Sequence, residues 1–219
     1  MNIFFRRVIW LIMLIPAVYL AIIWNHIPET VPMHFDLKGN VDRYGSRDDF
    51  KVLIIALIII NAGVYLLVSN IYRIDPKRNA AQNKDRMQRI AFYVCAYLSA
   101  IWVMIIYATV HGDSSMIMKF VFVAMGLLFA LLGSNMYNIQ PNYFAGIRLP
   151  WTLENEDNWR KTHQFAGRLW FFGGLIIALA ALLLRNGQAI YISAAALAVL
   201  IIIPIVFSYN LYRKQTKKI

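Results

Sequence analysis

The sequence predicts an all-α integral membrane protein with six transmembrane helices, and three observations support this fold class. Of the 219 residues, 60% are hydrophobic and only 15% are charged, whereas a soluble domain carries roughly 25% charged residues. The apolar residues are gathered in long blocks, and six of these blocks contain no Asp, Glu, Lys, Arg or His. The basic residues are concentrated near the termini and in every second connection between the blocks. This pattern excludes a disordered, a fibrous and a typical soluble protein.

Each uncharged block has about the length that a helix needs to cross roughly 30 Å of hydrocarbon. The blocks are Val8–Trp24, Val52–Ile71, Ile90–Val110, Phe120–Tyr137, Leu169–Leu184 and Ala189–Tyr209. The backbone must satisfy its own hydrogen bonds inside lipid, so each block is expected to be a helix. We expect the short fifth block to recruit part of Phe165–Arg168, with the Arg168 side chain reaching the interface. The first block is long and lacks a small-x-small cleavage site after it, so we expect it to remain in the protein.

The basic residues also predict the orientation, because cytoplasmic segments of membrane proteins are enriched in Lys and Arg. Sixteen of the 22 basic residues lie on one side, in segments 6–7, 73–89, 148–168 and 213–218. Both termini are therefore predicted to be cytoplasmic. The net charge of +11 then reflects topology, and because it is spread over four segments we expect no direct binding to nucleic acid.

The chain is expected to fall into three parts. Residues 1–72 form a first helical pair with an outward loop at 25–51, residues 73–89 a basic, solvated cytoplasmic linker, and residues 90–219 a four-helix part with an inward loop at 138–168. The spans carry no Asp, Glu, Lys, Arg or His, which argues against a proton-coupled carrier. Several polar residues of the spans are expected to form hydrogen bonds between helices. They are Asn61, Ser69, Asn70, Ser99, Ser134 and Asn135.

The outward loop has the composition of a short extended segment followed by turns. Thr30–Phe35 is expected to be extended, and Gly39 allows a turn, after which Asp42 is placed to accept hydrogen bonds from backbone N–H groups. Ser46 and Asp49 fit a capping box at the start of the second helix, and we favour this structural role over a functional one.

The outward loop also carries histidines and carboxylates, which would suit zinc. His26, His34 and His111 lack the close spacing of a ligand set such as HExxH, so turn and interface roles are favoured and no metal or cofactor is expected. His34, beside Phe35, is better explained as a packed or partner-contacting side chain. The single cysteine, Cys95, excludes an internal disulfide and is expected to pack in its apolar block.

The inward loop combines residues that fix the backbone with residues that suit binding. Asn142 and Gly146 allow a tight path, and Pro150 keeps the preceding residue extended. Thr152 is expected to be the N-cap of a helix that runs to about Phe165.

Two interpretations of this loop remain open from the residues alone. In the first it is an interfacial helix anchored by Trp151, Trp159 and Trp170. In the second, Asn142, Arg148, Thr162 and His163 line a polar pocket in which the arginine holds a carboxylate or phosphate. Lys could not reproduce the bidentate geometry of Arg148, which lies between Ile147 and Leu149 ahead of a proline.

Together, the two loops resemble the SdpI family of bacterial membrane proteins. The outward VPMHFDLKGNVDRYGS resembles an extracellular P-x-HF…G…D-x-x-GS module, and the inward NYFAGIRLPWTLENEDNWRKTHQFAG resembles the family signature. Leu149 stands where a Thr is expected and Gln164 where a basic residue is expected. The resemblance makes two sets of residues candidates for binding. The extracellular set is Pro32, His34, Phe35, Gly39, Asp42, Gly45 and Ser46. The cytoplasmic set is Asn142, Gly146, Arg148, Pro150, Trp151, Thr152, Trp159, Thr162 and His163.

The resemblance implies a bacterial inner-membrane protein that protects the cell from a secreted, membrane-active peptide toxin. It also implies a possible second role, holding a cytoplasmic repressor at the membrane. The expected partners are a peptide toxin on the outer face, a cytoplasmic repressor and the lipid bilayer. No catalytic residue is expected. The alternative is a membrane enzyme or lipid-headgroup-binding protein that uses Arg148, Thr162 and His163.

Overall fold

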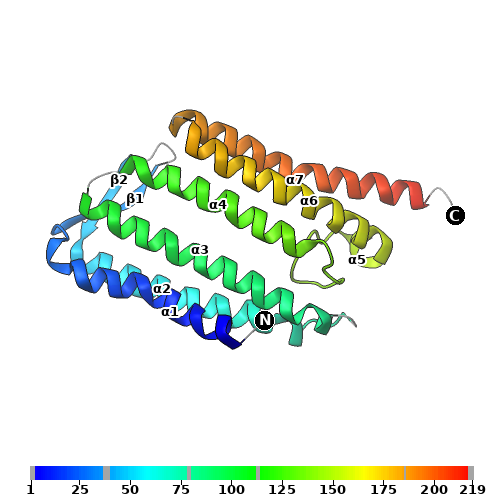
Figure 1. Ribbon diagram of the computed structural model, residues 1–219, viewed down its shortest axis with the longest axis horizontal. Coiled ribbons are helices and arrows are strands. Elements are labelled where there is room, and N and C mark those ends of the chain that lie inside the picture. The colour runs from blue at the N-terminus through cyan, green and yellow to red at the C-terminus, as the bar shows by residue number, and fades with distance from the viewer. Residues whose placement is uncertain (1–2, 37–39, 78–79, 112–113, 185, 217–219) are drawn as a thin grey trace.

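The computed structural model describes residues 3–36, 40–77, 80–111, 114–184 and 186–216. The long helices are α1 Ile3–Ile23, α2 Arg47–Asn70, α3 Lys84–His111, α4 Ser114–Met136, α6 Glu156–Leu183 and α7 Asn186–Thr216. A short helix α5, Pro150–Glu154, precedes α6, and three 3₁₀ turns lie at Trp24–His26, Ile71–Arg73 and Ala80–Asn83. Within these described ranges, six helices are long and apolar enough to cross a membrane, which confirms the six spans expected from the sequence (Figure 1). The orientation of the termini remains a prediction.

The six long helices pack side by side in two groups that meet along α3 and α4 (Figure 1). Helices α1 and α2 pack on α3, and α7 packs on α6. The most extensive contact is between α4 and α6. The N-terminus and the start of α6 lie toward the same end of the molecule, and the strands lie at the other.

Glycines bring α4 and α6 into direct backbone contact. A Cβ on Gly126 would lie 2.5 Å from the Gly174 carbonyl oxygen, and a Cβ on Gly133 would lie 2.7 Å from the Gly167 carbonyl oxygen. The two contacts, Gly126 with Gly174 and Gly133 with Gly167, lie two helical turns apart along antiparallel helices. Small residues allow membrane helices to approach closely, and dispersion contacts then stabilise the pair.

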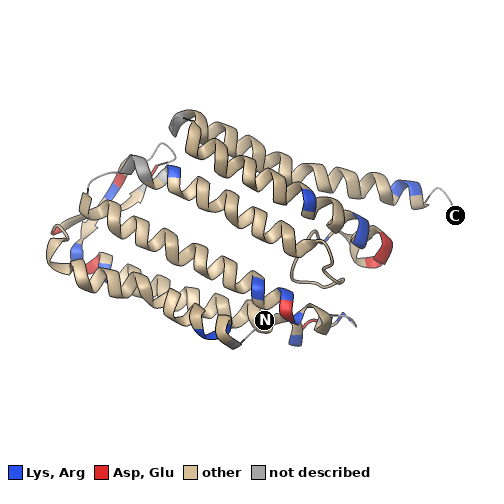
Figure 2. Ribbon diagram, viewed as in Figure 1, with Lys and Arg blue, Asp and Glu red and all other residues tan. Residues whose placement is uncertain are grey.

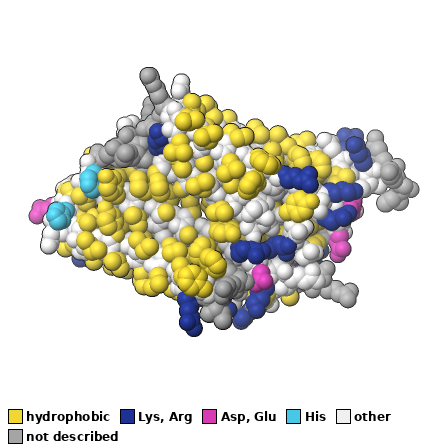
Figure 3. Space-filling model, in the orientation of Figure 1, with side chains coloured by type: hydrophobic (Ala, Val, Ile, Leu, Met, Phe, Trp, Pro, Cys, Tyr) yellow, Lys and Arg dark blue, Asp and Glu magenta, His cyan; other side chains and the backbone are white. Residues whose placement is uncertain are grey.

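The outer surface of the helices is apolar, as a lipid-facing surface must be. Leu11, Ile22, Ile59 and Ile176 each expose more than 60% of their surface. Hydrophobic side chains dominate the middle of the face in Figure 3, and charged residues lie toward the ends of the helices in Figure 2. Apolar surface on this scale would be unfavourable in water but not in hydrocarbon.

Strands β1, Thr30–Phe35, and β2, Val41–Ser46, form an antiparallel hairpin between α1 and α2. This confirms the extended conformation expected for residues 30–35. Val31 is fully buried in a cluster with residues of α1, α2 and α3, so the hairpin is fixed to one end of the bundle. Gly39 lies outside the described residues.

The capping box at the start of α2 is confirmed. The Ser46 Oγ accepts a hydrogen bond from the Asp49 N–H at 3.1 Å, and an Asp49 carboxylate oxygen accepts from the Ser46 N–H at 3.3 Å. Two of the N–H groups that a helix start leaves unpaired are thereby satisfied.

The prediction of one helix from Thr152 to about Phe165 is wrong. Helix α5 ends at Glu154, and α6 begins at Glu156 with Asn155 as its N-cap, whose side chain accepts from the Asn158 N–H at 2.9 Å. Helix α6 then continues without a break through the fifth span. Asn155 is as good an N-cap as threonine, and it stands directly before two acidic residues that suit a first turn.

The polar residues of the spans are divided between two kinds of hydrogen bond. Asn61 Nδ2 reaches from α2 to the Cys95 carbonyl and the Ser99 hydroxyl of α3, each at 3.1 Å, and Arg89 Nε donates across to Asn135 Oδ1 of α4 at 2.9 Å. Ser69, Asn70 and Ser134 instead donate to carbonyls of their own helices. Their expected role between helices is therefore wrong. Cys95 is fully buried, as expected.

Candidate functional site

The candidate site is built around the segment that connects α4 to α6, residues 138–155, which we call the motif loop. Asn142 folds the first part of this loop around its own side chain. Its Oδ1 accepts from the N–H groups of Phe144 and Ala145, at 2.9 and 2.7 Å, while Nδ2 donates to the carbonyls of Gln140 and Ala145. The amide is 2% exposed, so all of its bonding capacity is used to shape the loop.

His163 holds the next part of the loop against α6. Its Nδ1–H donates to the Trp159 carbonyl at 2.7 Å, and its Nε2 accepts from the Ile147 N–H at 2.9 Å. This pattern requires the neutral ring with the proton on Nδ1. The ring is fully buried and stacks on the Trp159 indole with 4.0 Å between centroids. Both nitrogens are thus engaged in structural bonds.

Gly146 makes this contact with His163 possible. Its φ is +103°, a left-handed conformation that favours glycine, and a Cβ there would clash with His163 Nε2. The tight backbone predicted at this glycine is therefore confirmed, and the structure adds the imidazole that requires it.

Thr152 and Pro150 fix the end of the motif loop. The Thr152 hydroxyl accepts from the Leu149 N–H at 2.8 Å and donates to the Ile147 carbonyl at 2.9 Å. Pro150 is the first residue of α5, and Leu149 before it is extended, with φ −107° and ψ 153°, as predicted. Thr152 is fully buried inside α5 rather than at the N-cap of a longer helix.

Arg148 lies on the surface of the loop. Its Nη1 donates to the Tyr143 carbonyl at 2.7 Å, which holds the side chain along the loop. Tyr143 and Phe144 are 44% and 39% exposed. The loop therefore presents two aromatic rings and one guanidinium to its surroundings.

The linker 73–89 is hydrogen-bonded to the motif loop. An Asp75 carboxylate oxygen accepts from the Tyr143 N–H at 2.8 Å, and Lys77 Nζ donates to the Leu153 carbonyl at 2.7 Å. Asn83 exchanges two hydrogen bonds with the backbone of Gln140, both at 2.9 Å. These long-range contacts could not be read from the local sequence, which showed only a polar, basic run.

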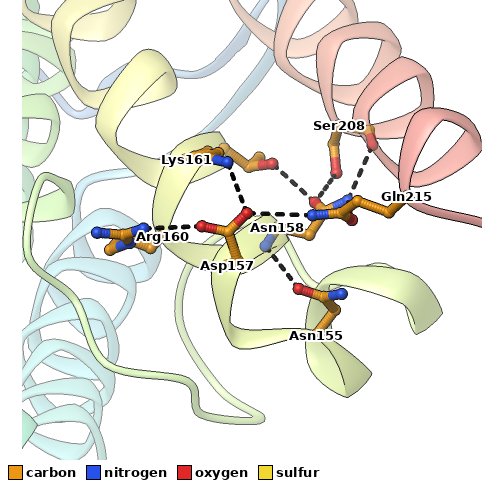
Figure 4. Close-up of polar contacts among 8 residues, drawn as sticks. Asn155, Asp157, Asn158, Arg160, Lys161, Ser208 and Gln215 are labelled. Carbon is orange, nitrogen blue, oxygen red and sulfur yellow. Dashed lines mark hydrogen bonds and ion pairs between the residues drawn. The ribbon is translucent and has the colours of Figure 1, made fainter. Parts of the chain in front are cut away.

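A buried polar network joins α6 and α7 (Figure 4), and Trp151 of α5 is bonded to it. The Asn158 Oδ1 accepts from the hydroxyls of Ser208, at 2.8 Å, and Thr162, at 3.0 Å. Its Nδ2 donates to the Ser208 carbonyl at 3.2 Å, and Trp151 Nε1 donates to the Ser208 hydroxyl at 2.9 Å. Asn158 and Ser208 were missed by the sequence reasoning. For Ser208, a polar residue within a long apolar run was the available signal.

An ionic cluster lies at the surface beside this network (Figure 4). The Asp157 carboxylate accepts from Arg160 at 2.7 Å and from Lys161 at 2.6 Å, and Gln215 of α7 also donates to it at 3.2 Å. A cleft of about 400 Å³ opens next to the cluster. It is lined by Tyr137, Asn138, Ile139, Gln140, Pro141, Glu156, Asp157, Trp159 and Arg160.

Neither interpretation of the inward loop is correct in full. Trp159 is 1% exposed and donates to the Ile139 carbonyl at 2.7 Å, so it is a core residue and not an interfacial anchor. The expected pocket lined by Asn142, Arg148, Thr162 and His163 is not formed. The side chains of Asn142, Thr162 and His163 are buried and hydrogen-bonded within the protein, whereas Arg148 lies on the surface.

The hairpin carries the extracellular candidates. His34 Nδ1 lies 2.6 Å from Asp42 Oδ1 across the two strands, and both side chains are about half exposed or more. Asp42 was expected to bond to backbone and instead pairs with this imidazole. Pro32 and Gly45 lie on the paired strands, and the side chain of Phe35 is not described. In the part of the chain that the structure describes, no three His, Cys, Asp or Glu residues gather as metal ligands.

Comparison with known proteins relates both loops to described families. Residues 138–208 match the SdpI/YfhL protein family, and residues 11–60, which include the hairpin, match a domain of unknown function, DUF1648. Over 196 residues the chain is 22% identical to immunity protein SdpI of Bacillus subtilis (strain 168), and the alignment covers 88% of each chain. No solved structure matches the chain. The resemblance to the SdpI family expected from the inward motif is thereby confirmed for residues 138–208, and the outward motif lies in the DUF1648 region.

Proposed function

Because this membrane protein has an SdpI/YfhL family region and is a distant homologue of an immunity protein, we propose that it protects a bacterial cell from a secreted, membrane-active peptide toxin. In this proposal the protein resides in the inner membrane and the hairpin faces outward to meet the toxin. The motif loop faces the cytoplasm and contacts a partner protein there, such as a repressor.

The observation that carries this proposal is the internal bonding of the motif loop. Asn142, Thr152 and His163 direct their polar atoms into the loop and α6, and the linker adds bonds from Asp75 and Asn83. A segment fixed at so many points can present a surface in one conformation, which lowers the entropic cost of binding.

The exposed groups of the loop have the chemistry of a protein contact. Tyr143, Phe144 and Arg148 lie at the surface, and aromatic residues and arginine are enriched at binding hot spots. Arg148 uses Nη1 on the Tyr143 carbonyl, which leaves its other N–H groups to receive a carboxylate of the partner.

We propose a binding role for this region in preference to an enzymatic one. A general base needs a nitrogen with access to a substrate proton, and both nitrogens of His163 are occupied by the backbone in a buried site. The enzymatic alternative also uses Thr162, but the hydroxyl of this residue donates a hydrogen bond to Asn158 Oδ1.

The test of this function is deletion of the gene followed by exposure to concentrated peptide secreted by the same bacterium. We expect the deletion strain to lose protection and the wild-type gene to restore it. A deletion strain that survives as well as its parent would show that the protein does not provide immunity.

Complementation with Arg148→Lys tests the role of the motif loop. Lysine keeps the positive charge and can still reach the Tyr143 carbonyl, but it cannot bind a carboxylate in a bidentate manner. We expect the affinity for the partner to fall at least about tenfold, a loss of about 1.4 kcal/mol, and protection to fall with it. Arg213→Lys, a change of the same kind at an exposed residue near the end of α7, is the control. If Arg148→Lys protects cells as well as the control and the wild type do at equal abundance, the working surface lies elsewhere.

A further inference from the structure

A second polar cavity lies at the same end of the molecule as the motif loop, on the other helical group. It has a volume of about 360 Å³ and opens between the start of α1, the end of α2 and the start of α3. We call it the basic pocket. Its lining consists of Arg6, Arg7, Trp10, Tyr65, Leu66, Ser69, Asn70 and Gln88.

Gln88 contributes an amide group to the lining of the basic pocket. Its side chain is 94% buried, because only 6% of its surface is exposed, and it lines the pocket. Among the residues that the structure describes, nothing bonds to its amide, and neither amide atom is among the fully enclosed, unpaired polar atoms. The amide therefore stays open to the pocket, where water or a ligand can pair with it.

Tyr65 adds a second donor to the same wall. It is 5% exposed, packs edge-on against Trp10 with 5.4 Å between ring centroids, and lines the pocket. Its hydroxyl likewise has no hydrogen-bond partner within the described segments. The pocket therefore offers donors on α2 and α3 to one bound group.

The charge of the pocket is positive. Arg6 and Arg7 are exposed and line the pocket, and no acidic residue contributes to its lining. Neither guanidinium forms an ion pair with the residues described here. The tendency of basic residues to flank the cytoplasmic ends of spans explains two arginines at this position. It does not explain why they line a cavity together with an amide that has no hydrogen-bond partner among the described residues.

We propose that the basic pocket binds the phosphate group of an anionic ligand. Arginine suits phosphate because its fork of N–H groups pairs with two oxygens at once, and amide and hydroxyl donors would satisfy the remaining oxygens. The pocket lies at the ends of three spanning helices, beside an exposed tryptophan, which is the depth at which lipid headgroups meet a membrane protein. A phosphate at this position comes either from an anionic lipid or from solution.

The test uses the full chain purified in a maltoside detergent, which contains no phosphate. Short-chain phosphatidylglycerol, short-chain phosphatidylcholine and inorganic phosphate are titrated separately, and binding is followed through the shift in the midpoint of thermal unfolding. The variants are Arg6→Gln with Arg7→Gln, and Gln88→Glu, which keeps the size of the side chain and adds a negative charge. The control is Arg213→Gln with Lys214→Gln, which removes the same charge from the end of α7.

We expect the affinity for phosphatidylglycerol to fall at least tenfold in the double arginine variant and in Gln88→Glu, and to stay within twofold in the control. A response to phosphatidylglycerol alone identifies a lipid headgroup as the ligand, and a response to inorganic phosphate that needs the same residues identifies a soluble one. Affinities that are equal in the wild type and both pocket variants, or that fall as far in the control, would overturn the proposal. Each variant is first shown to unfold cooperatively without ligand.

Discussion

At the scale of single residues, the motif loop depends on a glycine that no other residue can replace. Gly146 combines a left-handed backbone with a Cβ position that His163 already occupies. A side chain there would strain the backbone and displace the imidazole from the Ile147 N–H, so that two unfavourable effects arise from one substitution.

Gly146→Ala is expected to lower the free energy of unfolding by about 1–3 kcal/mol. The measurement is reversible unfolding of the purified protein in detergent. Gly63→Ala is the matched control, because nothing lies within 4 Å of the Cβ that it would add to α2, and alanine is the better helix former. If the two variants are equally stable, Gly146 does not carry the constraint described.

The local conformations of single residues could be predicted from the sequence more readily than their hydrogen-bond partners. The conformation of Gly146, the extended Leu149 and the capping role of Ser46 follow from local chemistry, and all were predicted. The contact of His163 with Ile147 spans 16 residues, and that of Asp75 with Tyr143 spans 68. Such contacts depend on how helices pack, which hydrophobic periodicity in one segment does not specify.

At the scale of elements, the first turn of α2 joins the hairpin to the membrane-spanning part of the chain. Ser46 is at once the last residue of β2 and the N-cap of α2. The strand and helix therefore share a boundary that the capping box fixes, and the direction in which the hairpin leaves the bundle depends on it.

Ser46→Ala should reduce the free energy of unfolding by about 0.5–2 kcal/mol, because the Asp49 N–H loses its acceptor. Protection from the toxin should fall only as far as the amount of protein falls. Both quantities are measured in one strain, by immunoblot and by survival. A variant of normal abundance that gives no protection would show that the Ser46 side chain has a direct functional role.

The division between α5 and α6 shows where sequence reasoning about elements fails. Thr152 and Asn155 are both good N-caps, and acidic residues follow each of them. The choice is made by Thr152 bonding to Ile147 and Leu149, which withdraws its hydroxyl from capping. The six spans were easier to predict, because a long uncharged run in this chain has one stable conformation in lipid.

At the scale of the whole molecule, the distribution of charge predicts that both termini face the cytoplasm. A cysteine introduced at Asn40, next to the hairpin, should react with a membrane-impermeant maleimide in intact cells, whereas one at Glu156, at the start of α6, should react only after lysis. Both positions are exposed to solvent. The wild-type protein serves as the background, since Cys95 is fully buried. The reverse pattern of labelling would invert the topology and exchange the faces assigned to the hairpin and the motif loop.

The glycine contact between α4 and α6 has a consequence for genetics. Every single-base change that replaces a glycine by another amino acid adds a Cβ, and at Gly126, Gly133, Gly167 and Gly174 that atom would fall within 3 Å of the opposite helix. Random mutagenesis for loss of immunity should therefore recover substitutions at these four codons, although the residues themselves contact neither a toxin nor a partner. Sorting alleles by the amount of protein in the membrane separates them from changes at a binding surface.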